Sequence, residues 1–466
     1  MGTLLRSFVM GLLALTGFGV ASHAADLGDT FKAPPQIPDT LTWQGITLYG
    51  SVDVGYGYST TGAPIGGSYW GINPQVLAAP AGRQPISSLN TVGLSGIGLK
   101  MEENIGSGWE AIGKLSTGFD PLTGKLDDMC AMRIQDNGLP SSQQTVAGNG
   151  TRCGQAINGE AWGGLKNASY GTLTVGRHLS IAGDLDYQYD PQTAIWSFSY
   201  LQFEGGGIPS FGFRWDDSVK YAYEYGPVHA QVMWAQGGQD AGLHGNSYAA
   251  DIGATSHGFS IDAIYTMMTD AVTDSTFGVG ACGTVGTPSC STLKATAQNI
   301  ALWGIMGKYT YDFAGRGLGG KLTFYAGYQH ARYSDPSNPL SVGDTVGGGY
   351  TIGLINNTAY LYGAANFGTY WIGTKYQTGP WTLAVAYYRE YQNYYNISAT
   401  STPCSTSISF NCAGAINTAS ASVIYAVNKH LDVYGGVIWS DLVGGQADGY
   451  ATPNMTTALT GLIFRF

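Results

Sequence analysis

The sequence has few charged residues and no long hydrophobic run beyond its first residues. Only 11% of its 466 residues are Asp, Glu, Lys or Arg, whereas typical soluble domains carry about 25%. After residue 24, no stretch approaches the 18 or so apolar residues that a transmembrane helix requires. The composition is therefore unusual for a soluble globule, and it predicts no transmembrane helix in this part of the chain.

Motifs of catalysis and of nucleotide or metal binding are also missing. The sequence has no HExxH, GxSxG, P-loop or dinucleotide fingerprint and no CxxC pair. A hydrolase would need a nucleophile beside a positioned base, and no histidine lies in such a motif. We therefore predict that the protein is not an enzyme and has no metal or cofactor. The formal net charge of −10 argues against nucleic acid as a partner, because nucleic acid selects basic surfaces.

Glycine and aromatic residues are abundant instead. The chain contains 70 Gly, 31 Tyr and 11 Trp, yet its mean hydropathy is close to zero, at −0.02. Side chains that alternate between lipid and water produce such a composition. A low-complexity secreted β-protein or adhesin would have similar numbers, so composition alone leaves both interpretations open.

Residues 1–24 have the pattern of a secretory signal peptide. Arg6 supplies a short positive region, residues 8–20 form an apolar core, and Ser22, His23 and Ala24 precede a cleavage site. About 13 apolar residues are too few to span a bilayer, which makes a membrane anchor the weaker interpretation. Residues 25–45 contain three prolines and are predicted to form an extended periplasmic lead-in.

From residue 46 onwards, segments of about 10 residues alternate in hydrophobicity, as transmembrane strands do. Ile97, Leu99 and Met101 share one face of such a segment, while Lys100 and Glu102 share the other. The pattern predicts sixteen strands, at 46–58, 89–102, 108–118, 158–166, 171–179, 216–225, 228–236, 246–256, 259–269, 297–311, 319–332, 365–377, 381–391, 416–427, 431–441 and 456–466. Residues 46–466 are thus predicted to form an all-β domain, a closed antiparallel transmembrane β-barrel, which in a single outer-membrane chain has an even number of strands.

Short and long connections alternate between the predicted strands. Tight turns are expected at 167–170, 226–227, 257–258, 378–380 and 428–430. The long loops are 59–88, 119–157, 180–215, 270–296, 333–364, 392–415 and 442–455. Short periplasmic turns and long extracellular loops are typical of outer-membrane barrels.

All six cysteines fall in pairs within three of the long loops. Because an exported chain enters an oxidising compartment, each pair is predicted to form a local disulfide. The predicted disulfides are Cys130–Cys153, Cys282–Cys290 and Cys404–Cys412. Metal binding is the weaker alternative, because these spacings do not resemble zinc sites.

Several segments of the sequence resemble the Gram-negative general-diffusion porins. They are 48–53 (LYGSVD), 98–100 (GLK) followed by 102–108 (EENIGSG), 171–177 (GTLTVGR), 218–221 (SVKY) and the terminal Phe466. The resemblance implies a water-filled outer-membrane channel, usually a homotrimer, for the passive diffusion of small hydrophilic solutes and ions. It also implies contact with outer-membrane lipid and with the outer-membrane assembly machinery, for which Phe466 would be the C-terminal signal.

The resemblance further implies that the third long loop, 180–215, folds into the lumen and narrows it. The acidic side of this constriction would comprise Asp184, Asp186, Asp190 and Glu204. The basic side would comprise Arg177, Lys100, Lys114 and Lys220. Two roles stay open for Arg177, namely a transverse field that selects solutes and a salt bridge that only holds the loop. The acidic excess suggests a mild cation preference.

Aromatic residues occur both in loop 180–215 and near the strand ends. In the loop they either pack against the wall, which we favour, or form a stacking track for ring-bearing solutes. Alternatives to a general porin are therefore a substrate-specific channel, for example for sugars, and a surface adhesin or binding protein built on a barrel. Near the strand ends, an interface girdle is predicted from Tyr56, Trp109, Trp234, Trp371 and Trp381.

Overall fold

The computed structural model places most of the chain after residue 40. The residues that it describes are 41–60, 68–69, 84–89, 95–119, 121–122, 124, 126, 156–192, 196–203, 214–237, 245–275, 292–313, 319–339, 341, 345–346, 350–405, 407–447 and 453–466. The predicted signal peptide and residues 25–40 of the predicted lead-in lie outside them. Within the described ranges, helices are short, and none has the length and apolar character needed to cross a membrane.

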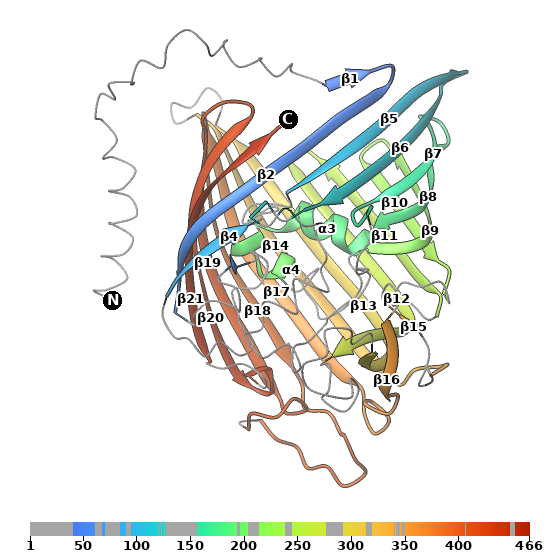
Figure 1. Ribbon diagram of the computed structural model, residues 1–466, viewed down its shortest axis with the longest axis vertical. Coiled ribbons are helices and arrows are strands. Elements are labelled where there is room, and N and C mark those ends of the chain that lie inside the picture. Colours follow the sequence, from blue (N-terminus) through green and yellow to red (C-terminus); the bar gives the residue numbers. More distant parts are fainter. Residues whose placement is uncertain are drawn as a thin grey trace. The chain divides into compact units, whose positions relative to one another are not determined.

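Sixteen antiparallel strands form a closed ring (Figure 1). In pairing order they are β2 (Ile46–Ser59), β5 (Gly96–Gly106), β6 (Trp109–Gly118), β7 (Ala161–Asn167), β8 (Gly171–Leu179), β9 (Arg214–Tyr225), β10 (Val228–Ala235), β11 (Ser247–Ser256), β12 (Phe259–Ser275), β13 (Thr292–Asp312), β14 (Lys321–Ser334), β17 (Ala365–Thr378), β18 (Trp381–Gln392), β19 (Gly414–Ala426), β20 (Leu431–Gly444) and β21 (Asn454–Arg465). The ring closes because residues 46–51 of β2 pair with β5, while residues 51–59 pair with β21. The predicted closed barrel of sixteen strands is confirmed, and each predicted strand corresponds to one strand of the ring.

Five further strands occur among the described residues outside this ring. They are β1 (Leu41–Trp43), β3 (Ser68–Tyr69), β4 (Gln84–Leu89), β15 (Thr345–Val346) and β16 (Tyr350–Asn356). β4 pairs with the end of β2, and β16 runs parallel to the beginning of β13. Most of these residues were predicted to lie in the lead-in or in long loops, and the end of β4 was predicted to form one strand with β5.

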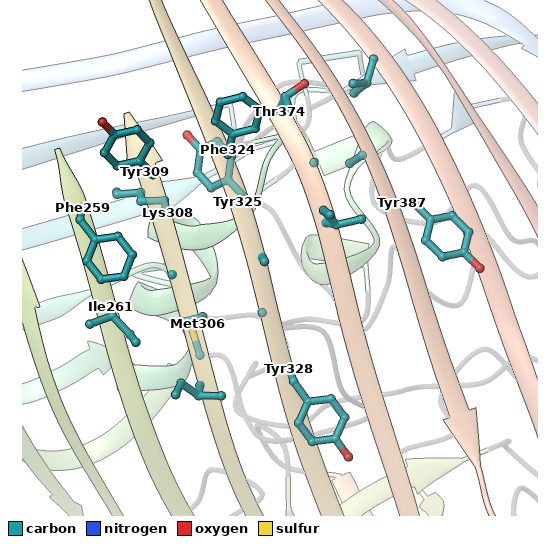
Figure 2. A pocket seen from close by; sticks show the side chains of 18 residues that line it. Phe259, Ile261, Met306, Lys308, Tyr309, Phe324, Tyr325, Tyr328, Thr374 and Tyr387 are labelled. Carbon is teal, nitrogen blue, oxygen red and sulfur yellow. The ribbon is translucent and has the colours of Figure 1, made fainter. Parts of the chain in front are cut away.

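Alternation along the strands places large apolar side chains on the outer face of the barrel. On the wall from β12 to β18 these include Phe259, Ile305, Phe324, Ile372 and Val385, all classed as exposed. Figure 2 shows a pocket on this wall, lined by residues of β12, β13, β14, β17 and β18 that are mostly apolar. Exposed apolar side chains of this kind suit the lipid-facing band of a transmembrane barrel.

The aromatic residues near the strand ends do not all face outward. Tyr56, Trp234 and Trp381 are exposed on the outer face, as predicted. Trp371 was predicted to join them, and this prediction was wrong, because its side chain is only 2% exposed and points into the barrel. Its strand parity decides its direction, since Tyr370 and Ile372 on either side face outward.

One of the predicted disulfides lies within the described residues and is confirmed. Cys404 and Cys412 are joined in the loop between β18 and β19, and Gln392 of β18 donates a hydrogen bond of 2.8 Å to the carbonyl of Cys412. The loop after β20 begins with a short 3-10 helix, η3 (Gly445–Ala447). The four remaining cysteines, which form the other two predicted pairs, lie outside the described residues.

The last residue of the chain takes part in closing the barrel. The backbone N–H of Phe466 donates to the carbonyl of Gly50 over 3.1 Å, and the N–H of Gly50 donates back over 3.0 Å. The phenyl ring of Phe466 lies where a Cβ on Gly50 would be. The strand edge is therefore paired to its end, while the role of Phe466 as an assembly signal stays a prediction.

Candidate functional site

The part of the chain that connects β8 to β9 includes a helical segment, which lies inside the ring (Figure 1). It comprises α3 (Ile181–Tyr189), the 3-10 helix η2 (Trp196–Phe198) and α4 (Tyr200–Phe203). The side chain of Ser180 caps α3 by accepting a hydrogen bond of 3.2 Å from the N–H of Gly183, which satisfies a free donor of the first turn. α3 contacts β10 to β14 on the inner face of the wall. The described residues of the third long loop thus lie in the lumen, as predicted.

At its beginning, α3 meets a cluster of opposite charges on the wall. Asp184 forms an ion pair with Lys220 of β9, and Lys114 of β6 forms one with Glu160, the residue before β7. Lys100 of β5 is the cross-strand neighbour of Lys114. Two of the predicted basic residues, Lys114 and Lys220, and one predicted acid therefore lie in this cluster.

The other two described acids of the segment face the opposite wall. Asp186 accepts a hydrogen bond of 2.8 Å from the side-chain amide of Gln329 on β14, and Asp190 accepts one of 2.5 Å from the hydroxyl of Tyr388 on β18. Both carboxylates are fully buried. Burial raises the pKa of Asp190 to about 6, and it raises the pKa of Asp186 well above the usual range. The predicted acidic side is thus divided between two walls of the lumen.

Further contacts attach the segment to β17, β19 and β20. The indole of Trp371 donates 3.0 Å to the carbonyl of Tyr189. Gln192 donates 2.9 Å to the hydroxyl of Ser420 and accepts 2.6 Å from that of Ser422, both on β19. The ring of Phe198 lies against β20, where Gly436 leaves room for it. The described part of the segment is therefore attached to the wall near its beginning, at its middle and at η2.

Arg177 lies near the end of β8, just before the segment begins, and links β8 to its neighbours. Its guanidinium forms an ion pair of 2.6 Å with Asp216 of β9 and donates 2.8 Å and 3.1 Å to the carbonyls of Gly159 and Asn158. The residue as a whole is 5% exposed. Glu204, the fourth predicted acid, lies outside the described residues.

Two basic residues that were not among the predicted site residues lie near α3. Lys308 of β13 donates 3.1 Å to the carbonyl of Gln188 and lies 5.2 Å from the ring centre of Tyr189. Lys375 of β17 lies over the ring of Tyr325, at 5.6 Å. The strand alternation that placed Lys100 in the lumen also applies to these two residues. Within the described part of the lumen, positive and negative groups thus occur on both sides of α3.

Three aromatic residues of the predicted loop 180–215 pack against protein. Phe198, Tyr200 and Trp215 are at most 1% exposed, and the ring of Tyr200 lies 6.2 Å from that of Tyr388 on β18. Buried rings cannot stack with a solute that passes through the lumen. Packing of the loop, the favoured of the two interpretations, therefore describes these three residues.

Comparisons with known proteins agree with the barrel architecture. A family model described as Gram-negative porin matches residues 11–444. Among solved structures, the anion-selective porin from Comamonas acidovorans has a TM-score of 0.57 at 13% identity, with 90% of this chain and 99% of that chain covered. The trimer form of OmpT from Vibrio cholerae has a TM-score of 0.53 at 11% identity, with coverage of 90% and 99%. OmpF from Salmonella typhi has 0.50 at 16% identity, with coverage of 92% and 100%. A comparison with curated proteins gave no match.

Proposed function

The chain belongs to the Gram-negative porin family, and on this basis we infer that it is an outer-membrane channel for passive diffusion of small hydrophilic solutes and ions. It is a channel and not an enzyme. The observation that carries this function is the closed ring of sixteen strands with a charged helical segment fastened across its lumen. Such a segment limits the size of solutes and exposes them to charges from both walls.

Four finer properties are part of the proposal. Residues 1–24 are a signal peptide that exports the chain, residues 25–45 form the periplasmic lead-in, the channel assembles as a homotrimer, and Phe466 is the signal for the assembly machinery. The backbone pairing of Phe466 with Gly50 supports a role of the last residue in completing the barrel. A trimer form has been solved for the Vibrio cholerae protein named above, and the shared fold makes the same assembly a reasonable proposal here.

We further propose a mild preference for cations. The net charge of −10 and the buried acids of α3 support it, while the lysines on both walls oppose a strong preference. The named relative from Comamonas acidovorans is anion-selective, and at 13% identity its wall charges do not transfer to this chain.

The test is a current recording from the purified protein in a planar lipid bilayer under a KCl gradient. We expect stepwise conductance in groups of three, and a reversal potential whose sign indicates cation preference. A folded protein that carries no current would overturn the channel. Conductance in single steps would contradict the trimer alone, and a reversal potential of the opposite sign would contradict only the cation preference.

Acidification is expected to weaken the cation preference, with a midpoint near pH 6. The reason is that the pKa of Asp190 is raised to about 6, so lowering the pH through this value removes a negative charge beside the lumen. The Asp190→Asn variant should lose this part of the pH dependence of the reversal potential. Asp312→Asn, at an exposed ion pair with Lys321, is the matched control and should behave like the wild type.

Stability should follow the same titration. The folded barrel holds the proton of Asp190 more tightly than the unfolded chain does, where the pKa is about 4. Its contribution is therefore complete below about pH 4 and is lost as the pH rises through about 6. The difference in unfolding free energy between wild type and Asp190→Asn should change by about 3 kcal/mol across this window. Equal pH profiles for the two proteins in urea unfolding would contradict the assignment.

A further inference from the structure

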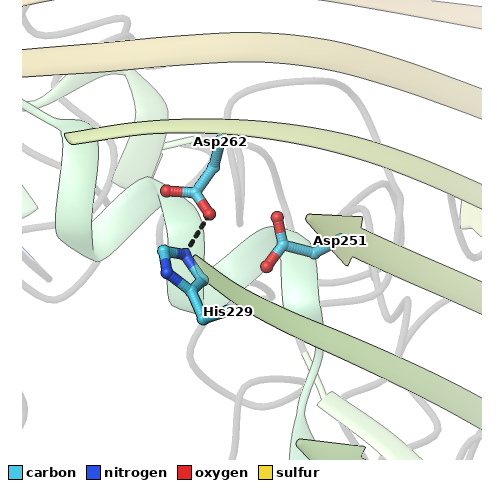
Figure 3. A group of neighbouring side chains, drawn as sticks. All are labelled: His229, Asp251 and Asp262. Carbon is cyan, nitrogen blue, oxygen red and sulfur yellow. Dashed lines mark hydrogen bonds and ion pairs between the residues drawn. The ribbon is translucent and has the colours of Figure 1, made fainter. Parts of the chain in front are cut away.

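A separate cluster of side chains lies on three neighbouring strands in the part of the wall that α3 contacts. His229 of β10, Asp251 of β11 and Asp262 of β12 each offer one possible ligand atom, and these atoms lie within 4.8 Å of one another (Figure 3). Asp251 is 4% exposed and Asp262 is 1% exposed, whereas His229 is only partly buried. The cluster is distinct from the acids of the constriction described above.

The register of the strands keeps a space open between these side chains. His229 and Asp262 both pair with Gly253 of the middle strand, so they flank a position without a side chain. A Cβ atom on Gly253 would overlap the Nε2 atom of His229 and the Oδ1 atom of Asp262. Asp251 precedes Gly253 by two residues and therefore projects from the same face. The glycine thus allows the imidazole and the two carboxylates to converge.

Neighbouring groups donate hydrogen bonds to the Oδ2 atom of each carboxylate. The hydroxyl of Tyr189, which is in α3, donates to Oδ2 of Asp262, and the side-chain amide of Gln231 donates 3.4 Å to Oδ2 of Asp251. The Oδ1 atom of Asp262 is 2.5 Å from the Nε2 atom of His229. Groups such as Tyr189 and Gln231, which orient the possible ligands by hydrogen bonds, are typical of the second layer around a metal site.

The unsatisfied Oδ1 atom of Asp251 indicates that a ligand binds here. It is buried and has no hydrogen-bond partner among the described residues, although such an atom costs about 1–3 kcal/mol or more when it is unsatisfied. Gln231 donates only to the Oδ2 atom of this carboxylate, so the Oδ1 atom remains unsatisfied. A cation placed between the three side chains would satisfy it and would compensate two buried negative groups at once.

We propose that His229, Asp251 and Asp262 form a binding site for a divalent transition-metal ion of the zinc type. One imidazole nitrogen and two carboxylate oxygens are a donor set that Zn²⁺ accepts in open sites, where water completes the coordination. Ca²⁺ and Mg²⁺ favour oxygen donors alone. The His229 nitrogen binds in its neutral form, so the proton that it shares with Asp262 moves to Nδ1 or leaves to solvent. Through Asp262 and Tyr189, the bound ion would fasten α3 to the wall.

The test is a calorimetric titration of the purified, chelator-treated full-length protein with ZnCl₂. We expect one ion per chain and at least a tenfold loss of affinity in both His229→Asn and Asp251→Asn. Tyr189→Phe, which removes only the backing hydroxyl, should lose affinity by about tenfold. Asp312→Asn is the control for loss of an acid elsewhere and should bind as the wild type does. Binding that is absent, or that is equal in wild type, His229→Asn and Asp251→Asn, would overturn the site.

A second measurement needs no variant and thus does not depend on how a variant folds. Co²⁺ added to the wild-type protein should give the visible absorption of a low-coordinate site, and Zn²⁺ should displace it in a one-to-one ratio. The spectrum of hydrated, six-coordinate Co²⁺ would overturn the proposal. Neither measurement requires the protein to conduct ions, so failure of the metal site and failure of the channel are distinguishable.

Discussion

Trp371→Ala is expected to raise single-channel conductance and to destabilise the barrel by about 3–5 kcal/mol. The Trp371 side chain is 2% exposed, its ring lies over Gly327 of the neighbouring strand, and its indole holds the C-terminal end of α3 through the carbonyl of Tyr189. Alanine leaves a cavity beneath the helix and removes this donor. The constriction segment then loses a central attachment and leaves more of the lumen open.

The matched control is Trp303→Ala on β13. The Trp303 side chain is 47% exposed on the outer face, so its removal deletes the same number of atoms without reaching α3. We expect wild-type conductance from this variant in the same bilayer recordings, and a smaller loss of stability in urea unfolding. If both variants conduct as the wild type does, Trp371 does not hold the constriction.

The barrel was predictable because its physical cause produces a local pattern in the sequence. Side chains that alternate between lipid and water impose a period of two, and this period located all sixteen strands of the ring. It also assigned Lys100, Lys114 and Lys220 to the inner face, and the same reasoning would have found Lys308, Lys375 and the inward direction of Trp371. The prediction for Trp371 was wrong because it relied on closeness to a strand end and not on parity.

The inward segment was predictable only in outline, because its geometry depends on helix α3 and only a loop was predicted there. Successive residues of a helix turn by about 100°, so Asp184 and Asp186 point to opposite sides while Asp186 and Asp190 share one side. The charge on α3 is therefore divided between the wall at β9 and the walls at β14 and β18. Gln329 and Tyr388, which donate to Asp186 and Asp190, lie more than 140 residues further along the chain. No local sequence pattern predicts such contacts.

The cluster of His229, Asp251 and Asp262 shows the same limit. Each residue lies on the lumen face by alternation, but their convergence depends on the register between β10, β11 and β12 and on Gly253 between them. A one-residue slip would turn one of the three outward. The spacing of 11 and 22 residues along the chain resembles no metal motif, so the sequence analysis predicted no metal site.

Arg177→Met is expected to cost about 3–5 kcal/mol of stability, because it removes the guanidinium that forms an ion pair with the buried carboxylate of Asp216. The guanidinium and the carboxylate are 2.6 Å apart, at side-chain exposures of 6% and 8%. Arg177→Met combined with Asp216→Leu should recover most of the loss, since replacing both members of a buried pair by apolar groups is often neutral. The remaining deficit should be about 0.5–1.5 kcal/mol for each of the lost hydrogen bonds to Asn158 and Gly159. Urea unfolding of the three proteins measures each step.

The same double variant separates the two roles that the sequence left open for Arg177. If its charge selected ions, removal of the pair would shift the reversal potential in a KCl gradient even where stability is restored. We expect no shift, because a charge that is almost fully buried and neutralised by Asp216 projects little field into the lumen. The ion pair of Lys220 with Asp184 is more exposed, with 15% and 37% of the side chains accessible, so Lys220→Met should shift the reversal potential towards cation preference. A shift in the Arg177 double variant and none in Lys220→Met would reverse this assignment and make Arg177 the selecting charge.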